Sequence, residues 1–131
     1  MREFSLRRFL IVLFLLLLID VPVIMVINHS MYKSLFQSIN GGSSPSLSRV
    51  APFAVFAYIL MALSITLFTN DWKSGALLGL VIYGIYNCTN SATITNYTSK
   101  EAIIDMTWGT ILFGLVSHIS LYFSPSSLHS L

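Results

Sequence analysis

Long apolar stretches recur four times along the chain, separated by short polar connections. Each stretch has about 20 mostly apolar residues, the length that an α-helix needs to cross the roughly 30 Å hydrocarbon core of a bilayer. The connections are too short to form a second domain. The pattern predicts a single membrane domain, residues 1–131, whose four transmembrane helices cover residues 9–27, 50–69, 75–95 and 102–123.

Two of the connections are tight, and they determine the topology. Residues 70–74 and 96–101 leave room only for a turn, so the helices that they join must run antiparallel. The sequence therefore predicts an all-α, integral membrane fold: an antiparallel four-helix bundle with both termini on one side.

The longer connection, residues 28–49, has a pattern of its own. Apolar residues recur at helical spacing between residues 30 and 39, before a Gly- and Ser-rich segment that begins at Asn40. This favours a short amphipathic helix in the headgroup region between spans 1 and 2. A solvated loop with incidental apolar residues is an equally good interpretation.

The first stretch has some features of a signal peptide, because Arg2, Arg7 and Arg8 precede a leucine-rich run. The apolar residues continue past Asp20 to Ile27, however, and no small-residue cleavage site follows. We therefore expect the stretch to remain as an uncleaved span.

Composition agrees with a membrane protein. Hydrophobic residues make up 55% of the chain and charged residues 9%, whereas an ordinary soluble domain carries about 25% charged residues. This excludes a soluble globular enzyme, a disordered regulator and a protein that binds nucleic acid through a basic face. The one cysteine, Cys88, lies in an apolar run and is expected to act as a small hydrophobic residue.

The few basic residues indicate an orientation. Four lie on the side of the termini and three on the other side, and three of the four precede the first span. The positive-inside rule therefore predicts that both termini are cytoplasmic. The basic residues that mark the two sides are Arg2, Arg7, Arg8 and Lys73 against Lys33, Arg49 and Lys100.

Polar residues inside the spans gather at one depth. Measured from the span ends opposite the termini, at 1.5 Å per residue, Asp20 is about 10 Å deep and Asn87 about 12 Å. Asn90 is about 8 Å deep, Asp105 about 5 Å, and Tyr58 again about 12 Å. An Asp in the membrane costs about 2.5–3.5 kcal/mol on insertion scales, so these groups are expected to face the bundle interior.

Helical spacing indicates which faces meet. Gly79, Tyr83, Asn87 and Asn90 follow a 4-4-3 spacing, which forms one stripe along the third span. We predict a polar site within the membrane made of Asp20, Tyr83, Asn87, Thr89, Asn90, Asp105 and Trp108.

Glycines predict where two helices pack closely. Gly75 and Gly79 form a Gly-x-x-x-Gly pair, and Gly109 shares a face with Asp105 on the fourth span. His118 is 13 residues beyond Asp105, about 20 Å along the helix axis, so it is expected at the opposite membrane boundary and outside the polar site.

Two segments resemble a known family. The run Tyr83-Gly-Ile-Tyr-Asn-Cys-Thr-Asn-Ser-Ala-Thr93 and the later Asp105-Met-Thr-Trp-Gly109 are similar to small predicted membrane proteins grouped as domain of unknown function 2177. That family also has an acid in the first span, which Asp20 matches. The resemblance covers nearly the whole chain and implies a four-span topology without an established activity. The family has an acid at the position of Asn87, so a proton carrier at that position would be missing from this chain.

Three classes of function remain to be compared. A structural or assembly component of a membrane complex is favoured, with the polar layer fixing how the helices fit and the apolar faces meeting other subunits or a second copy. The alternative is a small transporter or channel for protons, cations or a small polar solute, with Asp20 and Asp105 as the titrating groups. An enzyme is not expected, because no His, Cys or Lys lies near the two acids and no metal-ligand spacing occurs. No cofactor is expected.

Overall fold

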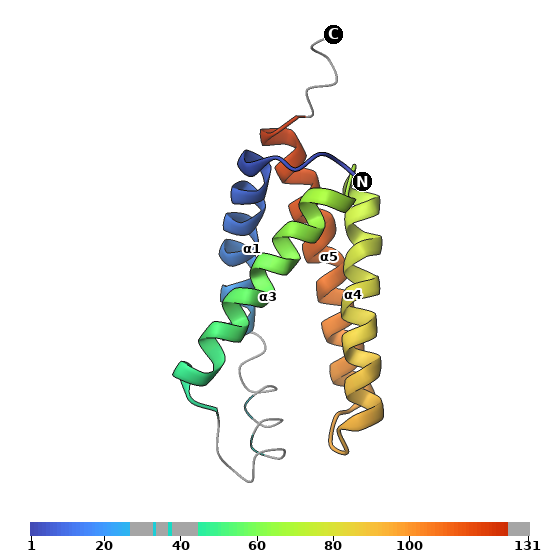
Figure 1. Ribbon diagram of the computed structural model, residues 1–131. Helices are drawn as coiled ribbons and strands as arrows, with labels where there is room; N and C mark the ends of the chain where they lie inside the picture. Colours follow the sequence, from blue (N-terminus) through green and yellow to red (C-terminus); the bar gives the residue numbers. More distant parts are fainter. Residues whose placement is uncertain (27–32, 34–36, 38–44, 126–131) are drawn as a thin grey trace.

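Figure 1 shows the computed structural model of the chain, an all-helical bundle in which the first and the last described residues lie at the same end. The structure describes residues 1–26, 33, 37 and 45–125, and no strand occurs among them. The helices are α1 (Leu6–Val26), α3 (Leu47–Phe68), α4 (Trp72–Thr93) and α5 (Ser99–Phe123). They run alternately down and up, as the tight connections predict, and the predicted antiparallel helical bundle is confirmed.

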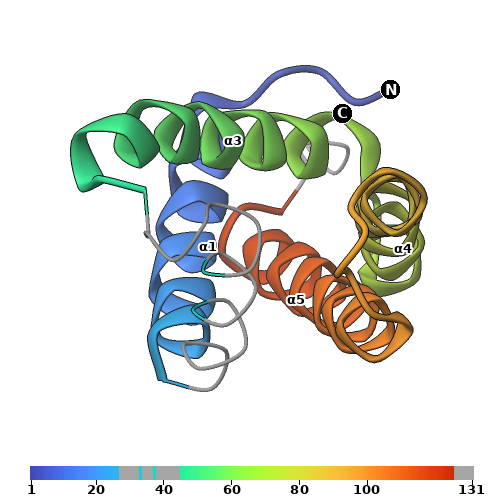
Figure 2. The ribbon, with the colours of Figure 1, turned by 90° about the horizontal axis from the view of Figure 1, so that it is seen from below.

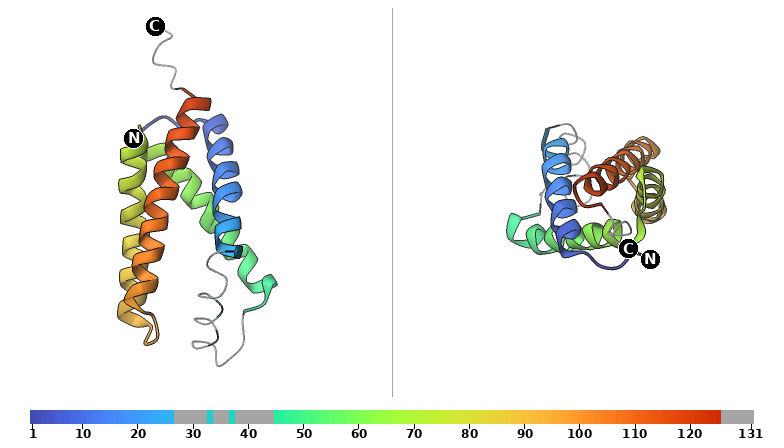
Figure 3. Two further views of the ribbon diagram at one scale, coloured as in Figure 1. Left: turned by 180° about the vertical axis from the view of Figure 1, so that it is seen from behind. Right: turned by 90° about the horizontal axis from the view of Figure 1, so that it is seen from above.

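Three of these helices, α1, α3 and α5, are long and apolar enough to cross a bilayer. The fourth, α4, has 22 residues, which span about 33 Å, but its second half carries Asn87, Thr89, Asn90 and Thr93 and is less apolar. Figure 3 shows α4 and α5 side by side along their length. Because α5 is one of the three candidate spans, α4 beside it covers the same depth along the bundle.

All four described helices begin three residues before the apolar stretches that predict them, and capping explains two of these starts. Asp71 accepts a hydrogen bond from the Ser74 N–H at 2.7 Å, and the Ser74 hydroxyl accepts one from the Asp71 N–H at 3.0 Å. Thr98 and Glu101 form the same reciprocal arrangement at the start of α5. The hydrogen bonds from Ser74 lower the pKa of the Asp71 carboxyl, so this cap is charged at neutral pH. Hydropathy marks the bilayer core, whereas the capped first turn belongs to the polar boundary.

The short interfacial helix predicted between the first two spans falls on residues 30–39. Of these, only Lys33 and Gln37 are among the described residues, and the prediction otherwise lies outside them.

Helix α5 occupies the centre of the arrangement. Seen from either end, it lies between α1 and α4, while α3 lies across the side of the bundle (Figures 2 and 3). It contacts α4 most extensively and also α1, whereas α3 contacts mainly α1. The buried apolar core is made by three helices: Val12 and Leu16 from α1, Ala62 and Ile65 from α3, and Leu112, Phe113 and Val116 from α5.

The closest helix contact is between α4 and α5, and glycines make it possible. A Cβ atom added at Gly79 would overlap the Gly109 carbonyl oxygen, and one added at Gly109 would overlap Cγ of Tyr83. At Gly75 the added atom would meet Cβ of Ser117 at 2.5 Å. Side chains larger than hydrogen at these positions would force the two backbones apart.

We therefore expect Gly79→Ala to destabilise the hairpin formed by α4 and α5. The new methyl group would overlap a backbone carbonyl, which cannot rotate away, and overpacking of this kind costs about 1–3 kcal/mol. The measurement is the fraction of detergent-solubilised protein that stays monodisperse after heating over a range of temperatures.

Gly84→Ala is the matched control on the same helix. An added Cβ there would have Cε of Met106 as its nearest neighbour at 3.4 Å, an ordinary contact with a flexible side chain. It should melt at or above the wild-type temperature, since Ala favours a helix over Gly. Equal melting of the two variants would contradict the close approach at Gly79.

Candidate functional site

Asp20 is a buried acid at which three helices meet. It lies on α1 and is 3% exposed. Its Oδ2 accepts a hydrogen bond from the Tyr58 hydroxyl of α3 at 2.6 Å, and its Oδ1 accepts one from Nε1 of Trp108 on α5 at 2.7 Å. We call these three residues the Asp20 cluster. Both carboxyl oxygens of Asp20 therefore act as hydrogen-bond acceptors.

The sequence of α1 places Asp20 inward. The buried residues of this helix are Arg8, Val12, Leu16 and Asp20, each four residues after the previous one. Residues four apart lie on one face of a helix, so this stripe is the face that α1 turns toward the bundle. Asp20 thus occupies the same face as the apolar core, at the far end of the helix from Arg8.

A second buried acid, Asp105, belongs to a separate group on the other side of α5. The Asn87 amide nitrogen donates to Oδ2 of Asp105 at 2.7 Å and to the Tyr83 carbonyl at 2.8 Å. The Asn87 amide oxygen accepts a hydrogen bond from the Tyr97 hydroxyl, which comes from the turn between α4 and α5. We call Asn87, Tyr97 and Asp105 the Asn87 cluster.

The amide at position 87 suits this environment because it both donates and accepts. A carboxylate there could not donate to Asp105 and would put two acids within hydrogen-bonding distance. The same surroundings change the pKa of the neighbouring Tyr97. Burial, and then the charge of Asp105, raises the pKa of the Tyr97 hydroxyl, so Tyr97 remains a hydrogen-bond donor.

The two clusters are neighbours along α5 but face different helices. Asp105 and Trp108 are three residues apart, about 4.5 Å along the axis. Asp105 bonds to α4, whereas Trp108 bonds to the acid of α1. The polar residues that the sequence groups by depth are therefore divided into two closed groups by α5.

The remaining predicted site residues have different surroundings. The Tyr83 ring packs edge-on against Phe113 with 5.8 Å between centroids, and its carbonyl joins the Asn87 cluster. Asn90 is half-buried and takes part in the hydrogen bonding of Tyr97. Thr89 is exposed, and its hydroxyl donates to the Ile85 carbonyl of its own helix at 2.7 Å. The structure does not bring Thr89 to either acid.

Arg8 is a buried functional group that sequence reasoning missed, because it was expected only to mark the start of a span. The side chain is 2% exposed. It donates to the carbonyl oxygens of Thr66 and Thr69 at 2.9 and 3.1 Å, and to the Thr69 hydroxyl at 2.8 Å. Its Nε also donates to the Ser120 hydroxyl at 3.3 Å. Arg8 thus caps the end of α3, where unpaired carbonyls give the helix its negative pole.

Hydroxyl groups complete this Arg8 site. The Ser117 hydroxyl donates to the Thr69 hydroxyl at 2.8 Å and contacts the Asp71 carbonyl at 2.9 Å. Three helices and the α3–α4 turn are joined by these bonds. One feature of the sequence could have identified Arg8 as buried. Buried positions of α1 recur every four residues from Arg8 to Asp20, which places both side chains on the apolar face of the helix.

The arrangement offers hydrogen bonding rather than open ligand positions. Within the described residues, every buried side-chain nitrogen and oxygen has a partner. In the same part of the chain, no three His, Cys, Asp or Glu side chains gather in a way that could hold a metal ion. What the acids and Arg8 do chemically in this geometry is connect one helix to another.

Comparison with known proteins supports the resemblance seen in the sequence. The model of a family described as "Predicted membrane protein (DUF2177)" matches residues 5–122, which include nearly all of the four helices. No curated protein and no solved structure matches the chain.

We predict that Arg8→Met destabilises the protein. Methionine preserves much of the apolar volume but leaves the carbonyls at the end of α3 without their donor, and an unsatisfied buried group costs about 1–3 kcal/mol. Thermal unfolding in detergent measures the loss. Arg7→Met removes the same charge from an exposed neighbouring position and is expected to have little effect. Comparable losses in both variants would assign the effect to net charge instead of to the cap.

Proposed function

The chain belongs to the DUF2177 family of predicted membrane proteins, and we propose that it is a structural subunit of a membrane assembly. In this proposal the buried polar clusters fix the relative positions of the helices, and the apolar outer faces pack against other membrane subunits or a second copy. No catalytic step is part of the proposal.

The Asp20 cluster is the observation that carries this proposal. Each oxygen of the carboxylate accepts a hydrogen bond from a different helix, so the acid is fully engaged in joining α1, α3 and α5. A proton or cation carrier must instead exchange its proton or ion with water on both sides of the membrane. The closed geometry therefore supports a structural role.

The energetic balance supports the same role. Interhelical hydrogen bonds in membranes contribute only about 0.6 kcal/mol on average, and they have a strong geometric requirement. An Asp inside the bilayer costs about 2.5–3.5 kcal/mol before it finds partners. Because this cost falls most in one arrangement of α1, α3 and α5, the acid favours that arrangement over other helix packings.

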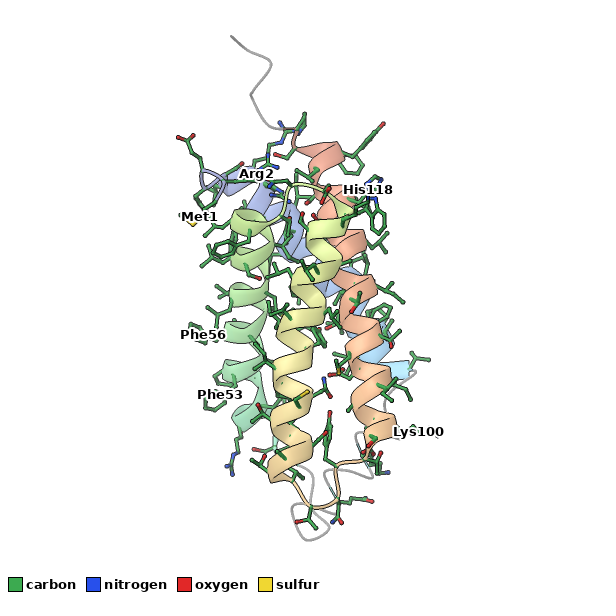
Figure 4. All side chains as sticks on the ribbon, turned by 90° about the vertical axis from the view of Figure 1, so that its right-hand side faces the viewer. Met1, Arg2, Phe53, Phe56, Lys100 and His118 are labelled. Atoms are coloured by element: carbon green, nitrogen blue, oxygen red, sulfur yellow. The ribbon has the colours of Figure 1, made fainter. Side chains whose placement is uncertain are left out.

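Helix α3 offers a surface on which another subunit could pack. Its buried residues, Ala62, Ile65 and Thr66, all lie in its second half. In the first half Phe53 is 75% and Phe56 is 60% exposed, and Figure 4 shows both side chains directed away from the other helices. The first half of α3 is also inclined away from α4 (Figure 1), so it is open to lateral contacts.

We also propose that both termini face the cytoplasm. The support is the excess of basic residues at that end, where Arg2, Arg7 and Lys73 lie near the ends of the helices. Labelling of Lys100→Cys in a Cys88→Ala background with a membrane-impermeant reagent tests this orientation. The reagent should label position 100 from the outside, and labelling only after the membrane is opened would reverse the assignment.

The structural role predicts two results for the purified protein. In liposomes, wild-type protein should conduct protons no faster than protein-free vesicles under an imposed potential. In mild detergent, light scattering should give a protein mass above that of one chain. Tyr58→Phe should reduce this mass, or lower the temperature at which the assembly dissociates. Tyr58→Phe removes one of the two donors to Asp20 but keeps the ring.

Asp71→Asn is the matched control, because it neutralises an exposed acid outside both clusters. It should leave the mass of the assembly unchanged. Proton flux in wild type that disappears in Asp20→Asn or Asp105→Asn would overturn the structural proposal and establish the transport alternative.

A further inference from the structure

A shallow groove follows the contact between α4 and α5 on the outside of the bundle. Its volume is about 530 Å³. Trp72 and Ala76 line it from α4, and Thr110, Gly114, Leu115 and His118 line it from α5. We call it the seam groove; it shares no residue with the Asp20 cluster or the Asn87 cluster.

Small residues create the hollow. A Cβ atom added at Gly114 would lie 3.2 Å from the Trp72 carbonyl oxygen and 3.3 Å from Cβ of Ala76, so the two helices are close at the floor of the groove. The larger side chains of Trp72 and Leu115, 53% and 42% exposed, stand on either side. The Thr110 hydroxyl donates to the Met106 carbonyl of its own helix at 2.8 Å, so it presents mainly its methyl group.

The groove extends from the membrane boundary toward the hydrocarbon core. The residue before His118, Ser117, contacts the Asp71 carbonyl at 2.9 Å, so His118 lies level with the start of α4. Figure 4 shows His118 at the end of the bundle that also holds Met1 and Arg2. From His118 to Thr110 the helix advances eight residues, about 12 Å, into the apolar layer.

Basic groups lie at the boundary end of the groove. Lys73 lies with its Nζ 5.8 Å from the centre of the Trp72 ring, which lines the groove from α4, and His118 lines it from α5. The positive pole at the N-terminus of α4 is capped by Asp71, whose carboxylate accepts a hydrogen bond from the Ser74 N–H. The boundary end therefore offers the Lys73 ammonium and the His118 ring to a lipid headgroup, and the remainder suits a hydrocarbon chain.

We propose that the seam groove binds one acyl chain of a phospholipid whose anionic headgroup lies against Lys73 and His118. An amphiphile with one acidic end and one apolar chain matches the groove in length, in polarity and in position relative to the bilayer. A helix of another subunit would not account for the basic residues at the boundary end.

The experiment uses full-length protein in vesicles that contain brominated phosphatidylglycerol or brominated phosphatidylcholine at equal mole fractions. Bromine on the acyl chain quenches the fluorescence of a tryptophan that it contacts, and Trp72 is the tryptophan in the groove. Quenching should correspond to a binding constant about fivefold higher for the anionic lipid, the size expected for one basic residue near an anionic surface. The difference should disappear in Trp72→Phe, because Trp108 does not line the groove and instead donates to Asp20 of α1.

Two variants separate the headgroup contact from the chain contact. In the double variant Lys73→Ala, His118→Ala, the ratio of the binding constants for the anionic lipid and for phosphatidylcholine should fall to about one. Quenching by either lipid should persist. Thr110→Leu should reduce quenching by both lipids, since it fills the deep end of the groove without removing a bond between helices. Lys73 and His118 are exposed, so their replacement should not affect folding, which an unchanged elution profile would check.

Lys100→Ala is the control, because it removes a basic residue at the opposite end of the bundle (Figure 4). It should retain the fivefold preference. Equal quenching by the two lipids in wild type would overturn the proposal and leave only nonspecific contact with surrounding lipid. A preference that survives the double variant, or quenching that is unchanged in Thr110→Leu, would also overturn it.

Discussion

The carboxylate of Asp20 sets the main constraint on this protein. A charged or strongly polar group inside an apolar bundle needs partners, and water is not freely available to supply them. Tyr58 and Trp108 are those partners, and they come from α3 and α5. Three helices that could otherwise pack through apolar contacts in several ways are therefore held in the one arrangement that brings both donors to the acid.

The same requirement for partners is met by different means at two other levels of the bundle. Near the turn between α4 and α5, an amide lies between Asp105 and the Tyr97 hydroxyl. At the end that holds the termini, Arg8 donates to carbonyls at the end of α3, so a buried cation is balanced by a helix pole and by hydroxyl groups. Between these levels, the apolar core and the glycine contact of α4 with α5 supply close packing. A bundle connected in this way is suited to keep one shape.

The outer surface has a different character from the interior. Large apolar side chains cover it, as expected where lipid replaces water, and the first half of α3 contributes aromatic side chains directed outward. The seam groove differs from this surface because its basic groups lie only at the membrane boundary. Protein partners and lipid headgroups would thus meet separate parts of the molecule, the former along α3 and the latter between α4 and α5.

The sequence alone determined the four helices, their antiparallel order and the membrane environment, because apolar length and short connections act locally along the chain. It also identified the polar residues by depth, since depth follows from a rise of 1.5 Å per residue. It could not assign partners, because the angle at which each helix faces its neighbours depends on all four helices together. Tertiary structure decided that Asp20 bonds to Tyr58 and Trp108, that Asn87 serves Asp105, and that Thr89 faces outward. It also turned Arg8 from an expected surface marker into a buried cap, because the end of α3, far away in sequence, provides the acceptors.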